Sequence, residues 1–255
     1  MLGVVSDPPE LGPADRSIAL RALTVDGAEG DAGRARAGRW FLCDPLVTDD
    51  PARCARDPSM HSVAGDGDSL TLAREALTSR GARTALFALC LGRAAAYDSA
   101  RGAIACPDEA GVAYPRTEGV VAFKTVRAAA AGATANQHPA IESARFDGAQ
   151  SGARWTIARC RTTPCASAEV LVTPSEASAE RLTDRREALT VSFFATDGSF
   201  DRPRAVTVEG SDGRDGSLRA AWTPPNRAGS VRVWLVLRDD RGGISLLERA
   251  IDVAD

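Results

Sequence analysis

The 255-residue sequence has few aromatic residues, two histidines, a single lysine (Lys124) and no long hydrophobic run. Its apolar stretches fall short of the roughly 18–20 residues of a membrane-spanning helix, which excludes an ordinary span of that kind. The basic residues are almost all arginines, and 31 of them in total oppose 34 acidic residues. A net charge of −3 gives no sign of a nucleic-acid-binding or membrane-surface protein.

The sequence does contain enough apolar material for folded cores. Hydrophobic residues make up 44% of the chain and charged residues 25%, values that exclude a disordered or collagen-like protein. The length exceeds that of one ordinary β-sandwich and fits two domains of roughly 100–150 residues each.

Six cysteines form an even set without the Cys-x-x-Cys spacing that zinc and redox sites favour. Neighbouring cysteines flank turn-rich loops, which favours three disulfides. The favoured pairs are Cys43–Cys54, Cys90–Cys106 and Cys160–Cys165. A bond between Cys43 and Cys90 across two facing strands is the open alternative. Structural disulfides indicate an oxidising compartment, so we expect an exported protein.

Helical periodicity is nearly absent, whereas the alternation of apolar and polar residues that is typical of β-strands occurs repeatedly. In the first half, strands are predicted at residues 17–25, 39–43, 84–91 and 119–126. A turn at Asp26-Gly27 ends the first of them. Residues 69–79 fit either a short helix or a strand followed by a turn.

Residues 128–135 are rich in alanine, glycine and threonine, lack an apolar pattern and are soon followed by Pro139, so they are predicted to link two domains. Further strands are predicted at residues 141–146, 154–158, 169–173, 189–195, 218–222, 230–237 and 244–253. Short strands separated by turns indicate antiparallel sandwiches. The predicted fold is all-β, with one sandwich in residues 1–130 and a second in residues 139–255.

Segments spread over most of the chain point to a family. They include residues 2–10 (LGVVSDPPE), 40–43 (WFLC), 121–126 (VAFKTV), 136–139 (NQHP), 189–196 (LTVSFFAT), 222–225 (WTPP) and 231–243. In these segments the chain resembles predicted surface lipoproteins of myxobacterial type, which carry immunoglobulin-like domains behind a lipidated cysteine. The resemblance implies two tandem immunoglobulin-like antiparallel β-sandwiches joined by a short linker, and no activity.

The resemblance also implies a location. Residues 1–6 contain neither a basic segment nor a useful apolar segment of a signal peptide, and no cysteine precedes Leu2. We therefore expect that a leader, with its lipid anchor, was removed or lies outside this sequence. The expected location is the bacterial outer membrane or cell surface, and otherwise the periplasm.

The tetrapeptide Gly67-Asp68-Ser69-Leu70 spells the motif of GDSL hydrolases. That mechanism needs the serine at the end of a buried parallel strand and a histidine in an Asp-x-x-His context to accept its proton. Neither His61 nor His138 has an aspartate three residues before it, and residues 60–66 are interpreted as a polar loop. We therefore expect a chance turn, no catalytic residue and no enzyme.

Acidic residues in the predicted loops are candidates for calcium ligands, because exported sandwiches often bind calcium between loops. They are Asp49, Asp50, Asp57, Asp66, Asp68, Asp212, Asp215, Asp239 and Asp240. The Asp-x-Asp-x-Asp-Gly pattern is missing, so solvated turn residues are the favoured interpretation. The two histidines are too far apart in sequence to predict zinc. No metal or cofactor is expected.

Tryptophans and arginines supply the remaining candidates. Trp40 is predicted in the core, whereas Trp222, directly before Thr223-Pro224-Pro225, is expected to be partly exposed and to be available for stacking on a sugar. Two small arginine clusters lack interleaved aromatics and predict solvated strand edges rather than a nucleic-acid surface. They comprise Arg34, Arg36, Arg39, Arg181, Arg185 and Arg186.

The leading hypothesis is a non-enzymatic, exported envelope or cell-surface protein that acts through protein–protein contact as an interaction or assembly component. Its partner would be another envelope protein or a second copy of itself, because open edge strands of sandwiches accept additional strands. The alternative is a carbohydrate- or small-ligand-binding module, with or without calcium. Nucleic acid is not expected as a partner, and a membrane only through the lipid anchor.

Overall fold

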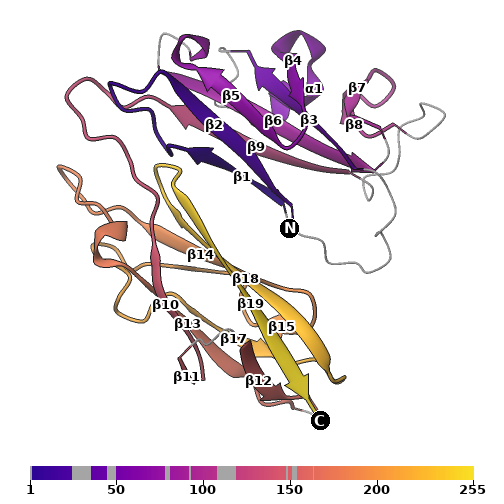
Figure 1. Ribbon diagram of the computed structural model, residues 1–255, viewed down its shortest axis with the longest axis vertical. Coiled ribbons are helices and arrows are strands. Elements are labelled where there is room, and N and C mark those ends of the chain that lie inside the picture. The colour runs from indigo at the N-terminus through magenta and orange to yellow at the C-terminus, as the bar shows by residue number, and fades with distance from the viewer. Residues whose placement is uncertain are drawn as a thin grey trace. The chain divides into compact units, whose positions relative to one another are not determined.

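The computed structural model describes residues 2–24, 36–44, 50–77, 81–91, 93–107, 119–147, 149–150, 154–162 and 164–255. Most of them lie in β-strands that form several sheets (Figure 1), as the sequence predicted. The chain divides into two compact units, which we call unit 1 (Met1–Asn136) and unit 2 (Gln137–Asp255). The division follows the predicted linker segment 128–135.

Unit 1 contains two principal antiparallel sheets. The three-stranded sheet has the order β1-β2-β5, with bounds Leu2–Asp7, Ser17–Thr24 and Ser69–Ala73. The four-stranded sheet has the order β4-β3-β6-β9, with bounds His61–Asp66, Arg36–Cys43, Ala82–Leu91 and Gly119–Arg127. Alternating residues of both sheets are buried in one hydrophobic core.

The core of unit 1 is centred on Trp40 and Phe87, whose ring centroids are 4.7 Å apart. Both side chains are fully buried, and the Trp40 indole Nε1 donates a hydrogen bond to the Gly67 carbonyl at 3.0 Å. Gly38 lies against this pair: a Cβ atom at that position would come within 2.8 Å of the Phe87 ring. The prediction of a buried Trp40 is therefore confirmed.

Unit 2 contains two five-stranded sheets. The first has the order β11-β10-β13-β17-β15, with bounds Ala149–Gln150, Ile141–Phe146, Ala168–Pro174, Arg219–Thr223 and Ser199–Phe200. The second has the order β12-β19-β18-β14-β16, with bounds Arg154–Ala158, Ile244–Ala254, Gly229–Asp239, Leu189–Ala195 and Arg204–Val206. The strand predicted at residues 230–237 is present, and its alternation places Val231, Val233, Leu235 and Leu237 in the core.

Trp222 is fully buried in unit 2, so the expectation of partial exposure is wrong. Its ring packs edge-on against Phe146 at 5.6 Å, and its indole Nε1 donates to the Asp197 carbonyl at 3.3 Å. The reason is the alternation of β17, which turns Ala220 and Trp222 inward together. Pro224 follows the end of this strand and does not change the inward direction of the Trp222 side chain.

Each unit pairs an N-terminal segment with its last strand in parallel. In unit 2, β12 runs parallel to β19 from Arg154↔Ala250 to Ala158↔Ala254. In unit 1, Leu11 forms a single parallel bridge to Ala128, directly after β9. Strand β1 comes before Leu11 and strand β10 before β12, and each belongs to the other sheet of its unit. In both units the N-terminal part of the chain therefore crosses from one sheet to the other.

The structure corrects the prediction for residues 61–66 and decides between the two alternatives for residues 69–79. Residues 61–66, interpreted as a polar loop, form β4, because β3 provides a pairing edge that is invisible in the local pattern. Residues 69–73 form β5 and are followed by a 3-10 turn at Arg74–Ala76, so the strand-and-turn alternative holds over the described part of segment 69–79. The predicted turn at Asp26-Gly27 lies outside the described residues.

Candidate contact surface

The four-stranded sheet of unit 1 carries apolar side chains on its outer face as well as its inner one. Val63, Phe41, Leu86 and Phe123 lie opposite one another in the ladders of β4, β3, β6 and β9 and form a row across the sheet. The two central side chains are almost fully buried, whereas Val63 is 59% and Phe123 39% exposed. The centre of this face is therefore covered and its two margins are open.

A small second core covers the centre. It is formed by helix α1 (Pro51–Arg56) and the hairpin β7-β8 (Ala96–Asp98 and Ala103–Ala105), which contribute Ala55, Ala95 and Ile104 to the cluster around Phe41 and Leu86. The Tyr97 hydroxyl donates to the Arg56 carbonyl at 3.1 Å and so joins the hairpin to the helix. We call α1 and β7-β8 together the cover.

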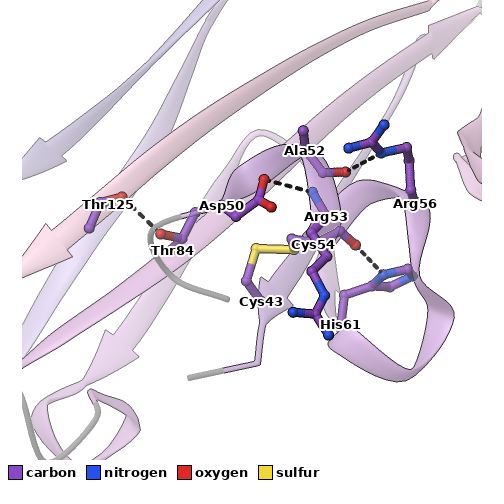
Figure 2. Close-up of a disulfide and its surroundings, with 9 residues drawn as sticks. All are labelled: Cys43, Asp50, Ala52, Arg53, Cys54, Arg56, His61, Thr84 and Thr125. Atoms are coloured by element: carbon purple, nitrogen blue, oxygen red, sulfur yellow. Dashed lines mark hydrogen bonds between the residues drawn. A yellow bond between two sulfur atoms is a disulfide. The ribbon is translucent and has the colours of Figure 1, made fainter. Parts of the chain in front are cut away.

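Two disulfides fasten the cover to the sheet. Cys43 at the end of β3 is bonded to Cys54 in α1 (Figure 2), and Cys90 in β6 is bonded to Cys106 directly after β8. The third bond, Cys160–Cys165, closes a short loop of unit 2. These are the three pairs predicted from neighbouring cysteines. The alternative Cys43–Cys90 bond is not formed.

Local hydrogen bonds hold α1 in place next to the first disulfide (Figure 2). The Asp50 carboxylate caps the helix by accepting from the Arg53 backbone N–H at 3.1 Å. The His61 Nδ1 lies 2.7 Å from the Cys54 carbonyl, and the His61 ring packs edge-on against Phe41 at 5.4 Å. His61 is thus part of the small core.

The open margin at β9 has a hydrogen-bonding edge. Within the described part of the chain, β6 is the only strand in a ladder with β9. The Arg127 carbonyl points away from β6, because it accepts from the Leu11 N–H. The Ala128 N–H points toward β6, because it donates to the Gly81 carbonyl directly before that strand. Because backbone direction alternates along a strand, the N–H and C=O groups of Val121, Phe123 and Thr125 point away from β6.

The same strand exposes apolar side chains and little charge. Val120 is 50%, Val121 40% and Phe123 39% exposed, whereas Lys124, the one charged residue in segment 119–126, is 7% exposed. Natural sheets usually protect an edge with exposed charges, proline or a bulge. None of these protects segment 119–126, although β1 of the other sheet lies close to part of β9. We call the outward backbone groups and exposed side chains of this segment the β9 edge.

The opposite margin of the sheet shows what such protection involves. The pairing of β4 with β3 contains a register shift between Trp40 and Phe41, which twists the edge. Asp66 at the end of β4 also forms an ion pair with Arg39, with 2.7 Å between Asp66 Oδ1 and Arg39 Nε. The hydrogen bond from Arg39 lowers the pKa of the Asp66 carboxyl.

The GDSL-like motif does not form a hydrolase site of the expected kind. Gly67 and Asp68 form the bend between β4 and β5, and Ser69 is an exposed residue at the start of β5. That strand is antiparallel to β2, whereas the mechanism needs a parallel one. His61 contacts the Cys54 carbonyl, and His138, in unit 2, accepts from the Ile244 N–H.

The acidic candidates within the described residues mostly cap turns or pair with arginines. Asp57, Asp212 and Asp215 accept from backbone N–H groups two residues later. Asp240 pairs with Arg185, one of the clustered arginines. Among the described side chains, no group of three or more His, Cys, Asp or Glu is arranged to hold a metal ion. Asp49 and Arg34 lie outside the described residues.

A buried charge cluster in unit 2 was not predicted. Glu187 is 1% exposed, and its carboxylate accepts from the Glu180 N–H at 3.2 Å. The Arg241 Nη1 lies 3.1 Å from the Glu180 carboxylate and 3.5 Å from that of Glu187. Burial raises the pKa of the Glu187 carboxyl to about 7; the hydrogen bond from Glu180 opposes this, and the carboxylates of Asp239 and Glu180 add to it.

Glu187→Gln is expected to remove the part of the pH dependence of unit 2 stability that lies between pH 4.5 and about 7. The pKa is raised in the folded state, so the folded chain holds a proton that the unfolded chain releases, and the free energy of unfolding falls as pH rises through this window. At about pH 8 the variant should therefore melt a few degrees above wild type. Thermal unfolding at about pH 5 and about pH 8 measures this, and equal pH dependence in both proteins would contradict it.

Within the described residues, no helix is long and apolar enough to cross a membrane.

Comparisons with known proteins do not assign this chain to a family. No protein-family model matches the chain, and no curated protein matches it significantly.

Among solved structures, the D00-D0 domain of intimin aligns over 100% of both chains with 11% identity and a TM-score of 0.30. Murine CEACAM1b also aligns over 100% of both chains, with 12% identity and a TM-score of 0.24. The Yersinia pseudotuberculosis adhesin InvE aligns over 99% of this chain and 59% of its own, with 14% identity and a TM-score of 0.25. At these values the likenesses carry no argument about fold or function.

Proposed function

We propose that this chain is an exported, non-enzymatic protein of the bacterial cell surface or envelope that binds another polypeptide by strand addition at the β9 edge. The observation that carries the proposal is the β9 edge itself: outward N–H and C=O groups at Val121, Phe123 and Thr125, flanked by exposed apolar side chains. An extended segment of a partner would complete these hydrogen bonds and cover Val121 and Phe123.

The strand order supports two tandem immunoglobulin-like sandwiches as the scaffold. Lettered along the chain, the sheets of unit 1 have the orders A-B-E and C′-C-F-G, and unit 2 adds a short strand beside E and a parallel A′ strand beside G. Orders of this type are those of immunoglobulin and fibronectin type III sandwiches. In this lettering β9 is strand G of unit 1, the last strand of its sheet.

The disulfides support export. All three cysteine pairs are bonded, and two of them fasten the cover over an apolar sheet face. Because cytosolic proteins rarely keep structural disulfides, a fold that depends on them belongs in an oxidising compartment. A lipid anchor on the precursor and a place at the outer membrane are the further parts of this proposal.

Val121→Pro is expected to abolish binding of the partner, whereas Val121→Ala is expected to weaken it only a few-fold. Proline removes one outward N–H and leaves the ladder between β6 and β9 intact, because the Val121 N–H points away from β6. Alanine shortens the side chain and keeps the N–H. Affinity capture from native envelope extract with wild type and both variants as bait, followed by mass spectrometry, measures the difference.

Two further results bear on this proposal. In the complex, the amides of Val121 and Phe123 should exchange with solvent at least tenfold more slowly than in the free protein. Recovery of the chain itself would identify a second copy as the partner. A partner that Val121→Pro retains as well as wild type does would overturn strand addition, and so would retention on polysaccharide alone. The buried Trp222 offers no sugar platform, so we propose no second function.

A further inference from the structure

The outer face of the second sheet of unit 2 is rich in hydrogen-bond donors. Alternation along β14, β16, β18 and β19 places one set of side chains opposite the core, and we call it the arginine face. Among its members are Thr190, Ser192, Phe194, Arg204, Val206, Arg232, Trp234, Val236, Arg238, Leu246, Glu248 and Asp252.

Two arginines on this face flank a buried hydroxyl without a compensating carboxylate. Arg204 lies opposite Ser192 in the ladder of β16 and β14, and the Arg238 Nη1 donates to the Ser192 Oγ at 3.1 Å. Neither guanidinium forms an ion pair within the described part of the chain. Burial, together with repulsion from Arg204, lowers the pKa of the Arg238 guanidinium.

A third donor on the same face lacks an acceptor. Trp234 is 3% exposed, and its indole Nε1 has no hydrogen-bond partner among the described residues. Arg232 covers the Trp234 ring at 5.6 Å and lies 4.0 Å from the Glu248 carboxylate, so its charge is balanced. A buried donor without a partner is rare in folded proteins. This nitrogen has almost no accessible surface, so a partner would contact the arginines rather than the indole N–H.

We propose that the arginine face binds an acidic polypeptide segment whose carboxylates pair with Arg204 and Arg238. Carboxylates supply the acceptors that the face lacks and neutralise the two adjacent positive charges. Apolar side chains border the arginines, with Val206 53% and Leu246 37% exposed, which favours a polypeptide with apolar side chains over an anionic polysaccharide. Arginine and tryptophan are also the residues that most often dominate protein–protein binding.

This inference goes beyond the proposed function, because it concerns unit 2 and does not use the β9 edge. It also distinguishes a binding role from a structural one. If these arginines stabilised the sheet, replacing them would lower the melting temperature of the protein. Arg204 and Arg238 repel each other, so Arg204→Gln should leave the melting temperature unchanged or raise it, while weakening binding of the acidic segment.

The test measures binding of the full-length protein to immobilised random copolymers of glutamate and tyrosine, with polyglutamate and dextran sulfate as comparison probes. The double variant Arg204→Gln/Arg238→Gln should bind the glutamate–tyrosine copolymer at least tenfold more weakly than wild type. The matched control is Arg219→Gln in β17, which removes a charge paired with Glu169 from the other sheet of unit 2 and should change the affinity less than twofold. Val121→Pro should not change it.

Three outcomes would overturn the proposal. The first is equal copolymer affinity of the double variant and wild type. The second is an equal loss in Arg219→Gln, which would reduce the effect to net charge. The third is binding of dextran sulfate that is as strong as that of the copolymer and is lost to the same extent in the double variant, because the face would then recognise an anionic polysaccharide.

Discussion

Replacement of the cysteines of either unit 1 disulfide by alanine is expected to lower the free energy of unfolding of unit 1 by about 3 kcal/mol, the size that loop closure gives for bonds of this span. The paired cysteines are 11 residues apart in Cys43–Cys54 and 16 residues apart in Cys90–Cys106. Without both bonds, α1 and β7-β8 are held on the sheet only by a small core and a few hydrogen bonds, such as that of His61 to the Cys54 carbonyl. The loosened cover should expose Phe41 and Leu86.

Chemical denaturation measures the loss, and fluorescence of anilinonaphthalene sulfonate reports the exposed apolar face. The matched control is removal of Cys160–Cys165, whose cysteines are only 5 residues apart and hold no cover. That change should have a smaller effect on stability, of about 2 kcal/mol, and should not increase dye binding. Equal dye binding by the cover variants and the control would show that the disulfides do not hold the cover.

Trp222→Ala is expected to destabilise unit 2 by about 3–5 kcal/mol, the usual loss for a large aromatic side chain removed from a core. The side chain is fully buried, contacts Phe146 and donates a hydrogen bond to the Asp197 carbonyl. Gly198, with φ of 74°, lies against the indole, since a Cβ atom there would come 2.7 Å from the Trp222 Nε1. The surroundings are thus closely fitted to this ring and leave a cavity when it is removed.

Urea denaturation of wild type, Trp222→Ala and Trp222→Phe measures this loss. Phenylalanine keeps most of the buried apolar area and gives up the hydrogen bond, so its effect should be less than half that of alanine. A loss below about 1 kcal/mol for Trp222→Ala would mean that the ring is outside the core. The expectation of an exposed tryptophan platform for a sugar would then return.

The strands that could be predicted from sequence are those with a local apolar pattern. In segment 230–237, every second residue is apolar because one side of β18 faces the core, and this local pattern is independent of the partner strands. Segment 61–66 has no such pattern. It becomes β4 only because β3 offers it a pairing edge, a long-range condition that a local window of sequence does not contain.

The candidate surfaces were less predictable than the strands, for the same reason. The strand at 119–126 was expected, but its place at the end of a sheet depends on pairing with β6. Arg204 and Arg238 are far apart in sequence and meet only because β14 pairs with both β16 and β18. The disulfides were predictable because each joins cysteines that are neighbours along the chain.

The parallel pairing of β12 with β19 also determines how unit 2 responds to tension. The two strands run in the same direction, so the chain enters the ladder at one end and leaves it at the other. Once β10 and β11 have been detached, a force applied to the two ends pulls β12 and β19 in opposite directions along their length. All hydrogen bonds of the ladder then resist sliding together, whereas the bonds of a hairpin pulled apart from its open end break one after another.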